Sequence, residues 1–495
     1  MRLPRLKSRP RWRLLAGAAV LGAGVALGQA PLGWWFVAVP ALSLFLGLAR
    51  SSPGWAGFAG GFGYALAGMF WITEPFLVEP EIFGWMAPFA LILMAAGMGA
   101  FWALGAGLGG RRGLPGIALG LVAMDALRSY ALTGFPWILF GHIWIGTPVA
   151  QAAAYVGPIG LSLLTLLLAV AFWRRWAGVV ALLALAGIWG AGQMRLNAPL
   201  PDGPAVTVRL VQPNATQALK WDPQYRLEFF YRHLDLTANP PAPGAPRPDL
   251  VIWPETAVPF LLDDPGDGLR MAAEAAGGAP VAMGIQRSEG LRYYNSLAII
   301  HPDGTVGPVY DKVHLVPFGE YIPYGDWLAR IGISAFAAQQ GNGYTAGQAE
   351  QVLDLGPLGR VQPLICYELI FPQDIRRVSE RPDWIMLVTN DAWFGTLSGP
   401  WQHLAQAQLI AVEFGLPVAR AANTGVSAMI DAKGRILDHL GMNDMGVIDA
   451  RLPAALPKTL YARVGDGPAL ALLLIMAVIV TVWGNNGVDR SRRRV

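Results

Sequence analysis

Long apolar runs at both ends of the chain enclose a middle segment with a different pattern. Runs of about 20 apolar residues, the length that a helix needs to cross a bilayer, fill the first 196 residues and recur near the C-terminus. They predict a transmembrane bundle over residues 1–196, a C-terminal transmembrane helix over 466–484 and a basic tail over 485–495. The eight predicted spans lie approximately at 14–30, 33–49, 54–73, 84–108, 113–131, 155–173, 177–194 and 468–483.

The segment from about 205 to 450 alternates short β-type runs with helical stretches. Runs such as DLVIWPET, RVQPLICYE and WIMLVTND are rich in Val, Ile and Leu and end in polar or turn-forming residues, which is typical of buried strands. DPQYRLEFFYRHLDLTA and PWQHLAQAQLIAVEFG have the length and periodicity of helices. This alternation predicts one α/β domain over 205–450 in which helices cover the sheets.

The basic residues between the spans predict an orientation. With eight spans, every basic turn falls on one side of the membrane, and the positive-inside rule makes that side the cytoplasm. Both termini are then cytoplasmic, and the domain at 205–450 lies outside the cytoplasm. The acidic stretch EPFLVEPE belongs to the opposite side. The basic sites are the first 13 residues, Arg50, 111–112, 174–175 and 490–494.

Composition agrees with a membrane protein that carries a folded extramembrane part. Charged residues make up 14% of the chain and the mean hydropathy is +0.40. The net charge of +4 is small, which argues against nucleic acid as a partner. A single cysteine excludes an intrachain disulfide and a cysteine-rich zinc site, and the six histidines have no zinc-hydrolase spacing. We therefore expect neither a metal nor another cofactor.

Two features of the apolar region leave alternatives open. The first span also resembles a cleavable signal peptide with a small-residue site near Ala30, although the spans that follow it favour retention. Asp125 and Arg128 lie three residues apart at the outer end of the fifth span. Such charges are costly in a membrane, so we favour a structural ion pair over contact with a lipid headgroup.

Polar residues collect where predicted strands of the middle domain end. Glu255 follows LVIWP, Cys366 follows QPLI, and Asn390 and Asp391 follow IMLVT. Sites in α/β proteins are commonly built at such strand ends. Each residue alone also has an ordinary structural explanation, since a lone cysteine is usually buried core and a lone lysine such as Lys312 is usually a solvated charge. The turn TNDAWFG is equally compatible with lining a site or with a plain polar turn.

Three stretches, taken in order, identify a family resemblance. IWPET around Glu255, YDKVHLVPFGEYIP around Lys312 and ICYELIFP around Cys366 resemble the carbon–nitrogen hydrolase, or nitrilase, superfamily. Together with the flanking spans, the whole chain resembles the apolipoprotein N-acyltransferases, the membrane-bound branch of that superfamily. TGFPW at 133–137 and LKWDP at 219–223 also resemble signatures of that branch. The resemblance implies an αββα sandwich for the domain outside the cytoplasm.

The chemistry of the three residues is consistent with acyl transfer. A thiol attacks an ester as the thiolate, so it needs a base or a positive field nearby. Glu255 can take the proton of Cys366 and return it to a leaving alcohol. Lys312 can favour the thiolate and stabilise the oxyanion. The acyl thioester on Cys366 can then be captured by an amine in a ping-pong reaction.

The resemblance supplies the partners and further site residues. It implies a membrane phospholipid as acyl donor, the free amine of the diacylglyceryl-cysteine of an apolipoprotein as acceptor, and a multi-pass protein of the bacterial inner membrane with its catalytic domain in the periplasm. We expect a monomer. Glu320 and Glu368 are expected to position Lys312, and Trp221 and Tyr367 to shape the substrate pocket.

Three further expectations concern single segments. The apolar stretch at 317–340 is expected to be an arm that dips toward the bilayer to admit lipid tails. Arg420 and Asn423 are expected to be structural. Asp125 stands where the resemblance leads us to expect Glu, which puts its pairing in doubt.

Two other functions compete with acyl transfer. A membrane-tethered amidase would use the same three residues with water as acceptor, but a soluble amide gives no reason for eight spans. A transporter with an inactive binding domain would need charges deep in several spans. Apart from Asp125 and Arg128 the spans carry almost none, so a transporter has little support.

Overall fold

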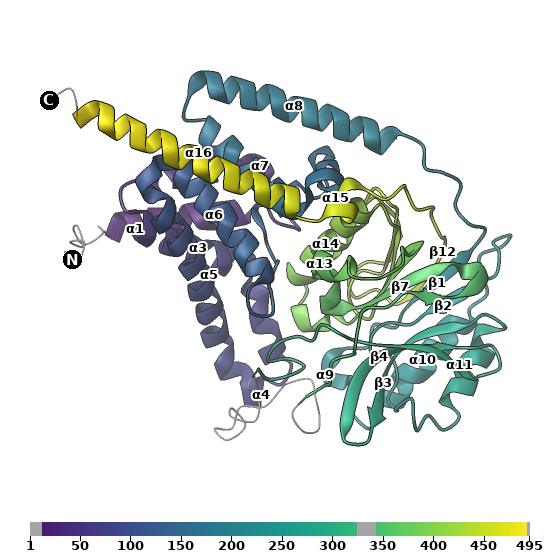
Figure 1. The fold of residues 1–495 in the computed structure, drawn as a ribbon. Coiled ribbons are helices and arrows are strands. Elements are labelled where there is room, and N and C mark those ends of the chain that lie inside the picture. Colours follow the sequence, from purple (N-terminus) through teal and green to yellow (C-terminus); the bar gives the residue numbers. More distant parts are fainter. Residues whose placement is uncertain (1–11, 324–342, 493–495) are drawn as a thin grey trace. The chain divides into compact units, whose positions relative to one another are not determined.

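The structure, a computed structural model, describes residues 12–323 and 343–492 (Figure 1). Most of the expected arm at 317–340 falls outside these ranges. The chain divides into two compact units. One comprises Met1–Asn197 and Arg463–Val495, and the other comprises Ala198–Ala462.

The first unit is helical, and each predicted span falls on one of its helices. Three stretches are long and apolar enough to cross a membrane, namely Pro80–Tyr130, Pro148–Ala171 and Arg175–Asn197. The shorter apolar helices are Trp12–Ala26, Trp35–Ala49 and Gly467–Val482. By helix length the described residues therefore support three membrane spans, and the number of eight spans stays a prediction. The helices are α1 (Trp12–Ala26), α2 (Trp35–Ala49), α3 (Pro53–Gly68), α5 (Ala87–Gly109), α6 (Gly113–Tyr130), α7 (Ala153–Ala171), α8 (Arg175–Asn197) and α16 (Gly467–Arg492).

Small residues allow close helix packing in this unit. Pro80–Tyr130 is interrupted by a 3-10 turn at Gly110–Arg112, and α5 and α6 on either side of that turn pack against each other. A Cβ atom added to Gly105 of α5 would lie 2.5 Å from the carbonyl oxygen of Gly120 in α6. The two backbones therefore touch, as is common between helices in membranes.

Asp125 and Arg128 form a buried ion pair that fastens a connection to the helices. The Arg128 guanidinium donates to Asp125 Oδ1 at 3.1 and 3.2 Å and to the carbonyl oxygens of Phe135 and Trp137 at 2.7 Å. The other carboxylate oxygen of Asp125 accepts from the backbone N–H of Phe140 at 2.9 Å. These contacts support the structural ion pair, and the shorter Asp side chain reaches all of its partners.

The second unit contains two six-stranded sheets. In each sheet three neighbouring strands are parallel, β1 to β3 in the first and β7 to β9 in the second. The first sheet has the order β12 (Gly446–Arg451), β1 (Thr207–Gln212), β2 (Leu250–Ile252), β3 (Val281–Glu289), β4 (Arg292–Ile300) and β5 (Val306–Asp311). The second has the order β11 (Ile436–His439), β10 (Ala428–Ile430), β9 (Val418–Ala422), β8 (Trp384–Thr389), β7 (Arg360–Ile365) and β6 (Leu353–Asp354).

Alternating apolar residues place the sheets face to face. Leu210 of β1 and Met386 of β8 belong to one core between the sheets. Val251 of β2 packs instead with α10 (Arg226–Ala238) and α11 (Gly268–Ala276), and Leu387 of β8 packs with α14 (Gly399–Phe414). Because side chains alternate along a strand, each sheet has one face to its partner and one to helices (Figure 1). The predicted αββα sandwich is confirmed.

Candidate active site

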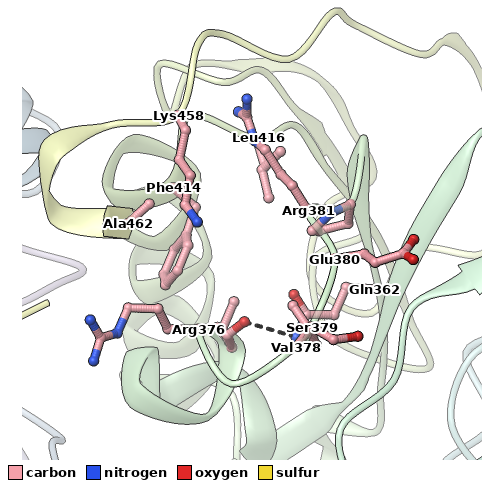
Figure 2. Close-up of a pocket in the computed structure, with 12 residues that line it drawn as sticks. Gln362, Arg376, Val378, Ser379, Glu380, Arg381, Phe414, Leu416, Lys458 and Ala462 are labelled. Carbon is pink, nitrogen blue, oxygen red and sulfur yellow. Dashed lines mark hydrogen bonds between the residues drawn. The ribbon is translucent and has the colours of Figure 1, made fainter. Parts of the chain in front are cut away.

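A surface pocket in the second unit involves none of the predicted site residues (Figure 2). It lies among side chains of β7, the segment after α13 (Pro372–Ile375) and the end of α14. The lining residues are Gln362, Ile375, Arg376, Val378, Ser379, Glu380, Arg381, Pro382, Phe414, Leu416, Lys458 and Ala462. The predicted chemistry must therefore be sought elsewhere, at the strand ends.

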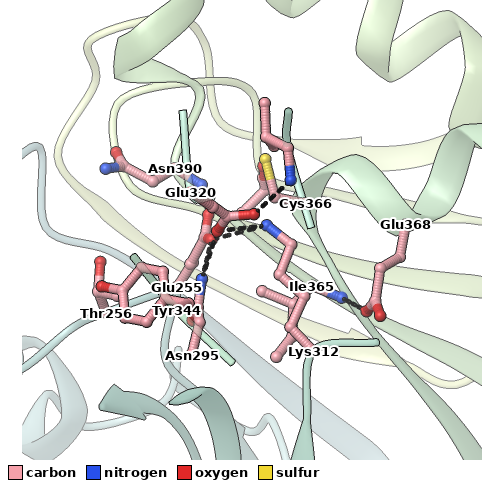
Figure 3. A network of polar contacts seen from close by, with 12 residues as sticks. Glu255, Thr256, Asn295, Lys312, Glu320, Tyr344, Ile365, Cys366, Glu368 and Asn390 are labelled. Carbon is pink, nitrogen blue, oxygen red and sulfur yellow. Dashed lines mark hydrogen bonds and ion pairs between the residues drawn. The ribbon is translucent and has the colours of Figure 1, made fainter. Parts of the chain in front are cut away.

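Glu255, Lys312 and Cys366 are brought together from three separate strand ends (Figure 3). Glu255 comes three residues after β2, Lys312 directly follows β5 and Cys366 directly follows β7. Lys312 Nζ lies 2.8 Å from Glu320 Oε1 and 3.5 Å from Glu255 Oε1. All four side chains are buried, Lys312 being only 1% exposed. The fold thus places an acid–base group, a cation and a thiol in one enclosed site.

The carboxylate of Glu255 is held by donors from two further strands. The backbone N–H of Asn390, which follows β8, donates to Oε2 at 2.9 Å. Asn295 in β4 donates its side-chain N–H to Glu255 Oε1 at 2.7 Å and to Glu320 Oε1 at 3.1 Å. These bonds fix the direction of the carboxylate.

The surroundings keep the thiol of Cys366 neutral and the side chain of Lys312 charged. Burial raises the pKa of the Cys366 thiol well above its ordinary value, and the negative charge of Glu255 adds to the effect. Burial alone would lower the pKa of Lys312, but the carboxylates of Glu320 and Glu255 outweigh it and raise that pKa above its ordinary value. At neutral pH the resting site therefore holds a neutral thiol beside an ammonium ion.

The backbone at Cys366 is held in an unusual conformation. Its φ of +51° lies in the left-handed region, which costs a non-glycine residue free energy. The residue begins the 3-10 turn η8 (Cys366–Ile370) directly after β7. On one side Glu368 Oε2 accepts from the N–H of Ile365 at 2.7 Å, and on the other His403 Nε2 lies 3.1 Å from the carbonyl oxygen of Cys366. The surroundings thus fix the turn that presents the thiol.

Glu368 joins the Cys366 turn to the loop after Lys312. Its Oε1 accepts hydrogen bonds of 2.7 Å from both the Tyr310 hydroxyl and the N–H of Val313. Among the described residues no hydrogen bond or ion pair joins Glu368 to Lys312 Nζ, so its direct contacts hold the loop and it interacts with the ammonium only through space. Burial raises the pKa of Glu368 to about 7, although the hydrogen bonds and Lys312 oppose the shift.

The two predicted aromatic residues differ in their surroundings. Tyr367 is buried, with its ring centroid 4.9 Å from that of Phe371 and 5.7 Å from that of His314. Trp221 is half-buried and directly follows the short helix α9 (Gln217–Lys220). Its ring centroid is 5.6 Å from Lys220 Nζ, and no polar contact joins it to the thiol within the described ranges.

Buried polar residues support the site, and the sequence singled out only some of them. Asp391, Arg420 and His403 form a fully buried cluster, in which Arg420 pairs with Asp391 and His403 reaches the carbonyl of Cys366. Asp391 and Arg420 were named from the sequence, whereas His403, Asn295 and Lys220 were missed, although the polar residue inside the apolar run YYNSLAII was a usable signal for Asn295. The expectation that Arg420 is structural agrees with its ion pair.

Asn423 and the turn after β8 also help to hold Glu255 in place. Asn423 donates to Asn390 Oδ1 at 2.9 Å and to the carbonyl of Ala215 at 2.7 Å. Asn390 in turn contacts Glu255 through its backbone, so the turn TNDAWFG borders the site. Among the residues that the structure describes, no group of three His, Cys, Asp or Glu side chains could hold a metal ion.

Comparison with known proteins identifies the families of both parts of the chain. Residues 207–459 match the carbon–nitrogen hydrolase model, and residues 21–171 match the model of the apolipoprotein N-acyltransferase N-terminal domain. The two matches together span most of both units.

Several relatives match nearly the full length of the chain. The apolipoprotein N-acyltransferase of Allorhizobium ampelinum is 39% identical over 94% of this chain and 96% of its own length. That of Bradyrhizobium diazoefficiens is 37% identical over 95% of each chain. That of Caulobacter vibrioides is 39% identical over 96% of this chain and 95% of its own. The chain therefore belongs to the apolipoprotein N-acyltransferase family, with a carbon–nitrogen hydrolase domain as its second unit.

Proposed function

We propose that the protein transfers an acyl chain from a membrane phospholipid to the free N-terminal amine of the diacylglyceryl-cysteine of an apolipoprotein. The transfer passes through a thioester on Cys366 in a ping-pong mechanism, with Glu255, Lys312 and Cys366 as the catalytic triad. The observation that carries the proposal is the contact of Lys312 Nζ with Glu255 and Glu320 beside the thiol. The names of the relatives support lipoprotein N-acylation as the overall reaction.

In the first half-reaction Cys366 attacks the ester carbonyl of the phospholipid. Glu255 takes the thiol proton as the bond to sulfur forms, because the resting thiol is neutral. Lys312 stabilises the negative charge that develops on the carbonyl oxygen. The ester C–O bond then breaks, Glu255 returns the proton to the leaving alkoxide, and a lysophospholipid departs from the acyl thioester.

In the second half-reaction the amine of the acceptor attacks the thioester. Glu255, again ionised, takes a proton from the attacking nitrogen, and Lys312 stabilises the second tetrahedral intermediate. The C–S bond breaks, the sulfur recovers its proton, and the acyl chain remains on the acceptor as an amide. One base thus serves both halves, which explains why its carboxylate is held by three donors.

Four further residues are assigned supporting roles. Glu320 holds the ammonium of Lys312 at 2.8 Å. Glu368 fixes the loop after Lys312 and the turn at Cys366. We assign Tyr367 and Trp221 to the wall of the substrate pocket, supported by their adjacency in the chain to Cys366 and to Lys220.

The proposed location is the bacterial inner membrane, with eight spans, both termini in the cytoplasm, the catalytic domain in the periplasm and a monomeric state. Three apolar stretches long enough to cross a membrane and the predicted spans that fall on helices support a multi-pass protein. The one-sided distribution of basic turns supports the orientation.

The experiment incubates the purified protein with labelled phospholipid and measures the acyl adduct on Cys366 by mass spectrometry. A diacylated lipopeptide with a free N-terminal amine is then added, and we expect it to discharge the adduct with formation of an amide. Cys366→Ala should give no adduct, with Cys366→Ser as a near-isosteric control. A wild-type protein without an adduct, or an adduct discharged only by water, would contradict the proposal, and the second outcome would favour an amidase.

A further inference from the structure

Lys220 is a buried cation outside the proposed triad. It ends α9 and is only 6% exposed. Its Nζ donates to the hydroxyl of Thr256 at 2.9 Å and to the backbone carbonyl of Glu255 at 3.2 Å. In the described ranges Lys220 forms no ion pair with a carboxylate. Both of its hydrogen bonds go to the turn formed by Glu255 and Thr256.

Burial of the Lys220 ammonium costs free energy that its own contacts offset only in part. A charge removed from water without an ion-pair partner is unfavourable, and an apolar side chain of similar length would fill the same space without that cost. Burial lowers the pKa of Lys220 to about 8, while the charge of Glu255 opposes the shift. The position therefore holds a costly group whose two hydrogen bonds both go to the turn that carries the proposed base.

The turn that Lys220 contacts is strained. Thr256 has a φ of +47°, and the left-handed region is particularly unfavourable for a β-branched residue. On the other side the turn lies against β3, since a Cβ atom added to Gly284 would come within 2.7 Å of Glu255 Cα. The N–H of Ala257 also donates to the carbonyl of Gly284 at 2.7 Å. The turn is thus clamped between the β3 backbone and the Lys220 ammonium.

We propose that Lys220 is a positioning residue of the active site, which holds the strained Glu255–Thr256 turn and thereby aims the carboxylate of Glu255 at the thiol and at the attacking amine. The inference rests on the proposed function, in which Glu255 is the base of both half-reactions. It goes further in assigning the placement of that base to a lysine that precedes it by 35 residues in the chain.

The role has an electrostatic consequence for the pH dependence of the reaction. Among the described residues, the titratable groups that interact with Lys220 are Glu255 across the turn and His233 of α10, and the Trp221 ring lies beside it. Glu255 also interacts with Lys312, Cys366 and Tyr344. Removal of the Lys220 charge takes one favourable interaction from ionised Glu255, so the acid limb of the rate profile should move to higher pH.

The test compares Lys220→Met with wild-type protein in both half-reactions. A misplaced base should slow thioester formation and amine transfer alike, each by about 10–100-fold, and shift the acid limb upward. Thr256→Val removes one of the two acceptors and keeps the charge, so it should slow both steps by less and leave the limb in place. This second variant also keeps the inference testable if Lys220→Met does not fold.

The matched control is Lys433→Met, which removes another buried lysine of the same unit, 2% exposed and bonded to the carbonyl of Ala198. It should lower the melting temperature and leave both rates within about twofold of wild type. Equal rates in Lys220→Met and Lys433→Met, or a defect confined to thioester formation, would overturn the inference while leaving the proposed function intact. Absence of the Cys366 adduct in wild-type protein would instead remove the proposed function.

Discussion

Lys312 brings together two carboxylates that would otherwise repel each other. Its ammonium lies 2.8 Å from Glu320 and 3.5 Å from Glu255, and all three side chains are buried. The attraction of both carboxylates outweighs burial and keeps the lysine charged. The same cation is therefore required for the fold of the site and, in our proposal, for the oxyanion.

Lys312→Met should affect stability and activity together. Two buried carboxylates would lose their counter-ion, which costs about 3–5 kcal/mol in the free energy of unfolding, and the thioester rate should fall by about 100–1000-fold. Thermal unfolding in detergent and the rate of adduct formation on Cys366 measure the two effects. The double variant Lys312→Met/Glu320→Gln should regain stability without activity; if it also regains activity, Lys312 has no role in the chemistry.

Glu368 predicts a pH dependence of stability. Burial raises its pKa from 4.5 to about 7 in the folded protein, so between these values the folded state binds more protons than the unfolded chain. Stability then falls as pH rises through this window, by at most about 1.4 kcal/mol per pH unit. Melting curves from pH 5 to 8 should show wild type losing stability relative to Glu368→Gln. Parallel curves for the two proteins would contradict this prediction.

Single helices and strands could be predicted from the sequence wherever their formation depends on the residues of the segment itself. The helices of the apolar spans were predicted from the length of each apolar run, and the strands around Glu255, Cys366 and Asn390 from short Val/Ile/Leu-rich runs with polar ends. The pairing of β12 with β1 was not predicted, because it joins residues more than 230 positions apart in the chain. Its outermost pairs are Gln212 with Gly446 and Thr207 with Arg451. A short edge strand of that kind has no local signature.

Packing of α5 against α6 predicts which glycines tolerate a side chain. Gly105→Val should destabilise the helical unit by about 1–3 kcal/mol, because its Cβ would lie 2.5 Å from the Gly120 carbonyl oxygen. Gly97→Val is the matched control on α5, since nothing lies within 4 Å of a Cβ there. The melting temperature in detergent measures the difference. Equal losses in both variants would show that the close approach of Gly105 to Gly120 does not set the cost.

For the whole molecule, the sequence predicted the combination of a membrane part with an αββα domain, and the ordered motifs predicted which side chains meet. It could not predict the support of the site, because Asn295, His403 and Lys220 act through contacts between distant segments. Their roles depend on which strands become neighbours, and no local pattern carries that information. The predicted triad was recognisable only because each member stands in a motif of its own.

The orientation of the chain gives the last prediction. The domain of residues 198–462 must face the periplasm if a phospholipid of the outer leaflet and an exported lipoprotein are to meet at Cys366. A protease site inserted in the Pro-rich loop at 239–249, which is largely exposed, should be cut by protease added to intact spheroplasts. A tag after residue 495 should stay protected until the membrane is lysed, because the positive-inside rule predicts a cytoplasmic location for the basic tail. Cleavage of the tag and protection of the loop would show the opposite topology. The domain would then face the cytoplasm, where an exported lipoprotein could not reach Cys366.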